Sequence, residues 1–101
     1  MITSKQRAEL RAIANGLDTI FQIGKNGITD ESVKQISAAL EAREIVKIKV
    51  LENAPYTAAE ASAELCQSLG AEGVSCVGRR FVIYRESKTL PKDKRIVLKS
   101  K

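Results

Sequence analysis

The stretch FQIGKNGIT, residues 21–29, contains two glycines that flank Lys25 and Asn26. Glycine adopts positive φ angles without strain and lets a backbone come close to a ligand. A helix-like pattern follows the loop, and unpaired N–H groups at a helix start favour an anion. Because Lys25 adds a positive charge at the tip, the loop is a candidate phosphate-binding site. The same spacing is also typical of an ordinary tight turn, so the loop alone leaves both interpretations open.

Residue types that support catalysis or metal binding are scarce. The sequence contains no histidine, which removes the commonest general base and any Ser-His or Cys-His pair. GKNG also lacks the longer glycine-rich run, ending in Lys-Ser or Lys-Thr, of an ATP-binding Walker loop. Cys66 and Cys76 are not spaced as metal ligands, and we expect two reduced, mostly buried thiols. We therefore expect no enzyme activity, no metal or other cofactor and no small-molecule substrate.

Length and hydropathy indicate one globular domain. The chain has 101 residues, of which 44% are hydrophobic, an ordinary share. No apolar run approaches the roughly 20 residues that span a bilayer. The first ten residues, MITSKQRAEL, lack the apolar core of a secretion signal. We expect a cytoplasmic monomer that does not contact membranes.

The positive charge is concentrated at the C-terminal end. Residues 1–84 contain ten basic and ten acidic residues, whereas residues 85–101 contain seven basic and two acidic ones, which gives the net charge of +5. A basic tail on a neutral body is typical of a nucleic-acid-binding arm, but also of a solvated terminus. We divide the chain into a folded domain, residues 1–86, and a basic, flexible tail, residues 87–101.

Three helices are predicted, each beginning after a threonine. Thr3 and Thr57 are each followed three residues later by Gln or Glu, which predicts two capping boxes. Thr29 precedes two acidic residues that favour the positive end of a helix dipole. The helices should end near Gly16, Arg43 and Leu69. Their buried stripes are predicted to be Leu10, Ile13, Ala14 and Leu17; Val33, Ile36 and Leu40; and Ala58, Ala61, Leu65 and Leu69.

Four short β-prone runs alternate with these helices, at residues 19–23, 45–51, 73–77 and 81–85. Gly78-Arg79-Arg80 suits a hairpin turn between the last two strands. The order α-β-α-β-α-β-β predicts an α/β single domain with parallel pairing between strands that a helix separates. The final hairpin adds an antiparallel pair, so we expect a four-stranded mixed sheet packed with helices.

The second strand has two contrasting faces. Val46, Ile48 and Val50 point to one side, and Lys47 and Lys49 point to the other. The lysines either lie on an exposed sheet face or pack their stems under a helix with only the ammonium groups in water. Phe81 and Tyr84 are expected in the core, which leaves no aromatic platform for stacking on bases.

Four separated motifs resemble successive landmarks of one known family. TSKQRAELRAIAN, FQIGKNGIT, LEAREIVKIKVLEN and VGRRFVIYR occur in the order found in the CRM domain (chloroplast RNA splicing and ribosome maturation), and most nearly in its stand-alone bacterial YhbY-type form. The resemblance covers about residues 2–86. It implies a fold similar to the C-terminal domain of translation initiation factor three. It also implies RNA binding through the GxxG loop and adjoining basic surface, much as a GxxG loop clamps nucleic acid in KH domains. For the bacterial members it implies association with precursors of the large ribosomal subunit.

The resemblance carries RNA-binding roles onto positions of this sequence. Asn15 and Arg43 stand where family members often have histidine, so no role is carried onto those two. We predict an RNA-binding assembly factor that contacts ribosomal RNA of large-subunit precursors. A protein-interaction adaptor that docks on ribosomal proteins is the alternative, and the tail could instead supply most of the RNA affinity. The predicted RNA-binding residues are Gly24, Lys25, Asn26 and Gly27 in the loop, with Arg7, Arg11, Lys47, Lys49, Arg79, Arg80 and Arg85 around it.

Overall fold

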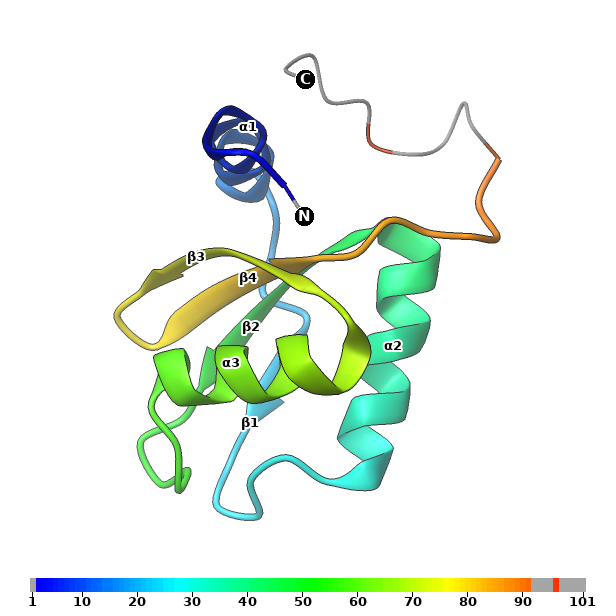
Figure 1. The fold of residues 1–101 in the computed structure, drawn as a ribbon. Coiled ribbons are helices and arrows are strands. Elements are labelled where there is room, and N and C mark those ends of the chain that lie inside the picture. Colours follow the sequence, from blue (N-terminus) through cyan, green and yellow to red (C-terminus); the bar gives the residue numbers. More distant parts are fainter. Residues whose placement is uncertain (1, 92–95, 97–101) are drawn as a thin grey trace.

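Three helices and four strands follow one another in the predicted order in the computed structural model, which describes residues 2–91 and residue 96 (Figure 1). The first predicted strand is shorter than expected, although the backbone N–H of Ile20 still donates to the carbonyl of Lys47 at 3.2 Å. The elements are α1 (Ser4–Ala14), β1 (Phe21–Ile23), α2 (Asp30–Arg43), β2 (Ile45–Val50), α3 (Ala58–Leu69), β3 (Glu72–Val77) and β4 (Arg80–Tyr84).

The four strands form one mixed sheet in the order β1-β2-β4-β3. β1 pairs with β2 in parallel, and β4 pairs antiparallel with both β2 and β3. The register of β3 against β4 shifts between Gly73 and Ser75, which marks a bulge in the outer strand. The predicted α/β class and mixed sheet are confirmed.

The helix starts form as the sequence predicts. The Thr3 hydroxyl accepts from the backbone N–H of Gln6 at 3.1 Å, and the Gln6 side chain accepts from the N–H of Thr3 at 2.9 Å. Thr57 and Glu60 repeat this capping box at the start of α3. These reciprocal bonds satisfy N–H groups that have no partner inside the helix.

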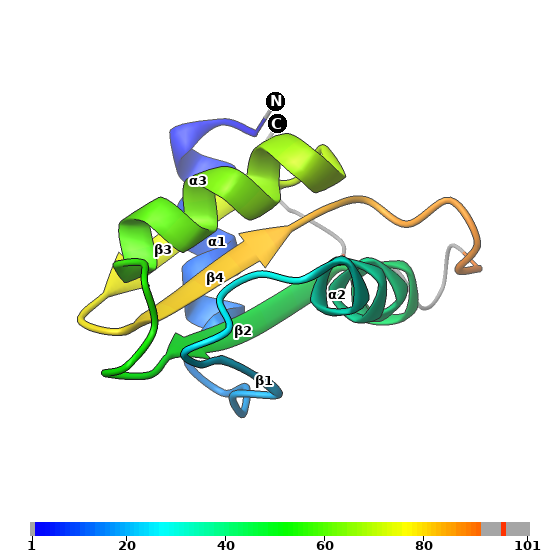
Figure 2. The same cartoon turned by 90° about the horizontal axis from the view of Figure 1, so that it is seen from below.

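Helices cover both faces of the sheet (Figure 2). α2 and α3 pack against one face, where Val46, Ile48 and Val50 join Phe81 and Ile83 in the larger core cluster. On the other face, the smaller cluster joins α1 to the sheet through Leu10, Ala14, Ile45, Val74, Val82 and Tyr84. Phe81 and Tyr84 are buried, as predicted, so neither ring is available for stacking on a base.

Two burial predictions are wrong. Ile13 was expected in the buried stripe of the first helix, but its side chain is 38% exposed. Leu10 and Ala14 are the buried residues of α1, and Ile13 is turned about 100° away from Ala14. Leu17, after the end of the helix, is partly buried against the same cluster. Cys76 was expected to be buried but is exposed, since it lies near the end of the outer strand β3. Cys66 is partly buried.

Candidate functional site

The GxxG loop is a tight turn with an exposed tip. The backbone N–H of Gly27 donates to the carbonyl of Gly24 at 2.9 Å, so Lys25 and Asn26 occupy the two central, exposed turn positions. Gly27 has a φ of 68°, and a Cβ added there would lie 2.9 Å from the Tyr56 ring. Both the backbone angle and the space therefore require glycine at residue 27. Gly24 has neither constraint, because an added Cβ would meet Leu51 at an ordinary 3.7 Å.

The start of α2 is less suited to an anion than the sequence suggested. Its N-cap, Thr29, accepts from the backbone N–H of Ser32 at 3.1 Å, and Asp30 and Glu31 lie in the first turn. Their carboxylates already complement the helix dipole and would repel a phosphate at that end. What the loop offers a ligand is therefore the Lys25 ammonium group and the turn itself.

The loop is held beside two other loops at one edge of the sheet. The backbone N–H of Leu51, after β2, donates to the carbonyl of Ile23, before the glycines, at 2.9 Å. The N–H of Val50 donates to the carbonyl of Arg79, in the β3–β4 turn, at 2.7 Å. The segments after β1 and β2 and the hairpin turn therefore lie side by side.

A row of four residues crosses the sheet at this edge. Gln22 pairs with Lys49, Lys49 with Arg80, and Arg80 with Val77. Paired residues point to the same side of a sheet. For this row, that side is the α1 face, because Lys49 alternates with the core residues Ile48 and Val50. We call Gln22, Lys49, Arg80 and Val77 the open row.

The open row brings two cations together without a counter-charge. Lys49 and Arg80 are directly opposed across β2 and β4, an arrangement that destabilises a sheet. Within the described part of the chain, neither side chain forms a salt bridge or a hydrogen bond. Arg80 is exposed and Lys49 is half-buried. An anion bound here would relieve the repulsion between them.

Four other predicted site residues make internal contacts. The Arg7 Nε donates to the carbonyl of Gly73 at 3.0 Å, and this bond ties α1 to β3. The Lys47 ammonium lies 3.5 Å from the carbonyl of Ala14, at the end of α1, so its stem lies under the helix. Arg79 pairs with Glu52 at 3.3 Å on the exposed surface.

Arg85 has the most contacts of this group and lies at the opposite end of β4 from Arg80. Its guanidinium donates to the carbonyls of Leu69 and Ser37 at 3.0 and 3.1 Å and pairs with Glu41 at 3.2 Å. Its Nε is buried without a hydrogen-bond partner. Arg85 therefore joins α2, α3 and the segment after β4, away from the open row.

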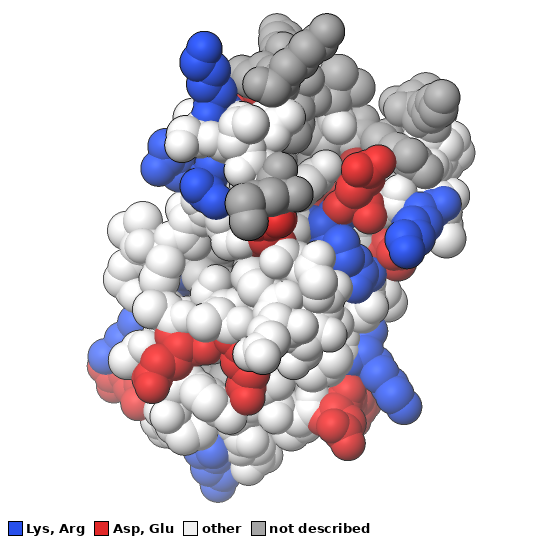
Figure 3. Space-filling view, viewed as in Figure 1, with Lys and Arg blue, Asp and Glu red and all other residues white. Residues whose placement is uncertain are grey.

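The structure thus divides the predicted residues into two groups. The GxxG loop, Lys49, Arg80 and the Glu52-paired Arg79 lie at the same edge of the sheet. Arg7, Lys47 and Arg85 instead bond to other elements of the fold. Arg11 is exposed on α1, one turn after Arg7. In Figure 3, which views the face of α2 and α3, acidic side chains follow α3 and basic ones lie mainly at the rim.

Sequence reasoning missed Gln22 and Val77, which join the open row only through strand register. Val77 is 76% exposed, the most exposed large hydrophobic side chain among the described residues. Next to it, a pocket of about 260 Å³ lies between the end of α1 and the sheet. We call it the α1–sheet pocket, and its lining residues are Ala14, Asn15, Lys47, Ser75, Val77, Arg80 and Val82.

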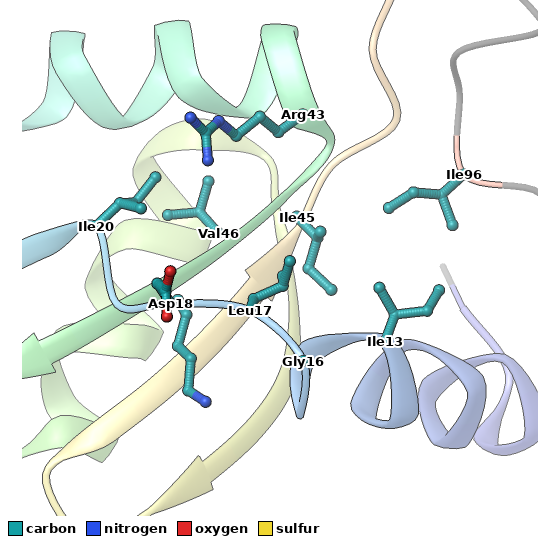
Figure 4. Close-up of a pocket in the computed structure, with 10 residues that line it drawn as sticks. Ile13, Gly16, Leu17, Asp18, Ile20, Arg43, Ile45, Val46 and Ile96 are labelled. Carbon is teal, nitrogen blue, oxygen red and sulfur yellow. The ribbon is translucent and has the colours of Figure 1, made fainter.

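A larger pocket of about 580 Å³ lies between α1, the segment 16–20 and the adjoining ends of α2 and β2 (Figure 4). Ile13 and Ile96 lie on one side of it, and Ile20 and Arg43 on the other. Aliphatic side chains dominate the walls, which accounts for the partial exposure of Ile13 and Ile20. Its charged lining residues are Asp18, Arg43 and Lys47.

The described residues offer little for metal or thiol chemistry. Within residues 2–91 and 96, no group of three or more Cys, Asp or Glu side chains is placed to hold a metal ion. Burial raises the pKa of the Cys66 thiol, opposed by a hydrogen bond from Ser62, so the less reactive thiol form is favoured. No helix in this part of the chain is both long and apolar enough to cross a membrane.

The residues after β4 pack against α2 beyond the predicted domain boundary at residue 86. Ser87 is buried, and its backbone N–H donates to the Glu44 carboxylate at 2.7 Å. The Ile96 N–H donates to the other oxygen of Glu44 at 2.6 Å. The other residues of the predicted tail, 92–95 and 97–101, lie outside the described residues.

Fold and surface together define a small α/β domain of three helices and a four-stranded mixed sheet with an exposed cationic edge. The same fold occurs in the solution structure of the Staphylococcus aureus protein SAV1595, named "a putative RNA binding protein". That structure matches with a TM-score of 0.70 and 41% identity, covering 97% of this chain and 99% of the other. Among sequence relatives, the probable RNA-binding protein YqeI of Bacillus subtilis is 41% identical over 88 residues, 87% of this chain and 92% of YqeI. An RNA-binding protein of Haemophilus influenzae is 28% identical over 86 residues, 85% of this chain and 87% of the relative.

The sequence pattern of the CRS1/YhbY (CRM) domain matches residues 2–85. The chain therefore belongs to the CRS1/YhbY (CRM) domain family, as the four motifs indicated.

Proposed function

We propose that this protein binds RNA at the sheet edge formed by the GxxG loop and the open row, and that it acts in the cytoplasm as an assembly factor, not an enzyme. Its RNA would be ribosomal RNA in precursors of the large subunit. The observation that carries the RNA proposal is the directly opposed pair Lys49 and Arg80. This pair has no carboxylate partner among the described residues and lies in the row that includes Gln22, three residues before Lys25. The names of the relatives support the same ligand class.

Binding at this edge would depend on phosphates and on the shape of the RNA. The rings of Phe81 and Tyr84 are buried and the Tyr56 ring packs half-buried against Gly27, so we expect phosphate contacts to supply most of the affinity. The GxxG turn lets an RNA backbone approach Lys25 closely, while Lys49 and Arg80 reach the neighbouring phosphates. Each cation that contacts a phosphate releases counterions, so affinity should fall steeply with salt.

Fluorescence anisotropy with a structured fragment of large-subunit ribosomal RNA tests the site. Replacing Lys25, Lys49 and Arg80 together by Gln should weaken binding and reduce the slope of log affinity against log salt by about 2 to 3, roughly one per phosphate contact. Lys34→Gln, on the exposed surface of α2, is the matched control and should change neither quantity appreciably. An unchanged affinity and slope in the triple variant would remove the proposed site.

Sedimentation tests the assembly role. Extracts are fractionated on sucrose gradients before and after nuclease treatment and after high-salt washing, and the protein is located in the fractions. We expect it with large-subunit precursors, released by nuclease or high salt. If the protein instead stays with ribosomal proteins after these treatments and has no affinity for naked RNA, an adaptor that docks on those proteins would be favoured.

A further inference from the structure

The α1–sheet pocket combines three chemical features within one small volume. Ala14, Val77 and Val82 provide apolar walls, and Asn15 and Ser75 provide polar groups. Lys47 and Arg80 add positive charge, and none of the lining residues carries a carboxylate. Within the described residues, the side chains of Asn15 and Ser75 form no hydrogen bonds, so both can bond a ligand.

We propose that this pocket takes the base of a single unpaired RNA nucleotide, while Lys49 and Arg80 bind the phosphates beside it. This inference rests on the proposed RNA binding and adds what part of the RNA is recognised. A nucleobase has apolar faces that suit Val77 and Val82 and a polar edge that suits Asn15 and Ser75. The volume of about 260 Å³ is just below the usual range for drug-sized ligands, so it fits one base and not a stack of several.

Charge and exposure favour an RNA strand as the occupant. Arg80 belongs both to the pocket and to the open row, so a phosphate bound by the row lies next to the pocket mouth. Val77, exposed on an outer strand, would be covered by the base. A base in a duplex is stacked and paired and cannot enter, whereas bases in bulges and loops can be displaced into a protein pocket.

Two hairpin RNAs of equal stem length test this, one fully paired and one with a single bulged nucleotide. Dissociation constants are measured for the natural protein, Val77→Ser and the control Ile20→Ser, which removes a partly exposed aliphatic side chain from the other pocket. Val77→Ser should weaken binding of the bulged hairpin by roughly five- to tenfold, the loss of one aliphatic contact. Its affinity for the paired hairpin and its salt slope should not change, because no charge is removed.

Asn15→Ala tests base preference at the bulge, a property that should not change if Asn15 had only a structural role. For hairpins with a bulged A, C, G or U, the natural protein should have four different dissociation constants. The variant should bind the four hairpins with more nearly equal affinity. Thermal unfolding of both variants shows whether they remain folded. Asn15 and Val77 are exposed, so we expect them to unfold at nearly the natural temperature.

The outcomes separate the two proposals. If the pocket variants bind both hairpins as the natural protein does, while Lys49→Gln and Arg80→Gln lose affinity, the pocket inference is overturned and RNA binding at the open row stands. If the charge variants also bind normally, the proposed site fails as well. Binding of an acidic peptide at these residues, with no affinity for either hairpin, would overturn both proposals.

Discussion

Residue 27 must be glycine because of its positive φ angle and its contact with Tyr56, whereas residue 24 has neither constraint. Gly27→Ala should destabilise the protein by about 2 kcal/mol or more, because a left-handed backbone angle and contact with the Tyr56 ring add together. Gly24→Ala is the internal control and should cost less than about 1 kcal/mol. Urea denaturation measures both. Equal losses would show that the left-handed angle and the Tyr56 contact do not govern the loop.

The unpaired cations of the open row should oppose folding while favouring ligand binding. Removing one of them by Lys49→Gln should raise the free energy of unfolding by about 0.2–1 kcal/mol at low salt, since a like-charge cross-strand pair is relieved. The same variant should bind RNA less tightly. Denaturant titrations at low and high salt test the first effect, which salt should screen.

Lys34→Gln is the matched comparison on α2. Lys34 follows Asp30 by four residues, so its removal should lower stability slightly or leave it unchanged. If Lys49→Gln lowered stability as well, the repulsion inferred for the open row would be wrong.

At the scale of elements, the last turn of α2 organises the segment that follows β4. Glu44 is buried and left-handed, with a φ of 67°, yet its carboxylate accepts from two backbone N–H groups. Its own N–H donates to Leu40 at 2.7 Å. An unfavourable backbone angle persists where surrounding bonds determine it. One residue thus ends α2, begins the turn into β2 and anchors the later chain.

Glu41, one turn earlier, should make stability depend on pH. Partial burial alone would raise the pKa of Glu41, but hydrogen bonds from Lys88, Ser87 and Thr89, with Arg85 nearby, lower it below its ordinary 4.5. Because the pKa of Glu41 is lowered in the folded protein, its carboxylate stabilises the fold fully above about pH 4.5. This stabilisation is lost as the pH falls through the folded pKa.

Unfolding free energies of the natural protein and Glu41→Gln, measured from pH 3 to pH 7, test this. The variant should be less stable at neutral pH, and the two curves should converge in acid. Glu64→Gln, at an exposed position of α3, is the control and should follow the natural protein. Parallel curves for Glu41→Gln at every pH would contradict the role assigned to the carboxylate.

At the scale of the whole molecule, folding and RNA binding should separate when the C-terminal end is shortened. A chain ending at Glu86 loses both backbone N–H groups that bond Glu44, those of Ser87 and Ile96, and leaving a buried carboxylate without these donors should cost roughly 1–3 kcal/mol. A chain ending at Pro91 keeps the Ser87 bond to Glu44, loses the Ile96 bond, and lacks five basic residues and one acidic residue of the natural chain. It should stay folded and retain most of its affinity for structured RNA, with a smaller salt slope.

Anisotropy and denaturant titrations on the two truncated chains check this pair of expectations. Near-complete loss of RNA binding in the chain ending at Pro91, with folding intact, would assign the affinity to the basic tail. The open row would then be a secondary contact.

The sequence by itself determined the local features of this protein. Threonine caps, helical stripes and strand alternation each depend on residues a few positions apart, so the elements and their order could be predicted. The absence of histidine removed the commonest general base and any Ser-His or Cys-His pair. The four motifs identified the family. The burial of Phe81 and Tyr84 was also expected, and the two rings lie on opposite faces of the sheet, each covered by helices.

Only the tertiary structure decided which charges remain available to a ligand. Arg7 meets Gly73 across 66 residues of sequence, and Arg85 reaches Ser37 across 48, contacts that no local pattern specifies. Gln22, Lys49, Arg80 and Val77 form one row only because of strand register, which depends on how four separated strands pair. In the sequence, nothing distinguished the eight Lys and Arg residues of the predicted site from one another. In the structure, Arg7, Lys47 and Arg85 bond to other elements of the fold. Lys49 and Arg80 lie side by side in the open row, with no partner among the described residues.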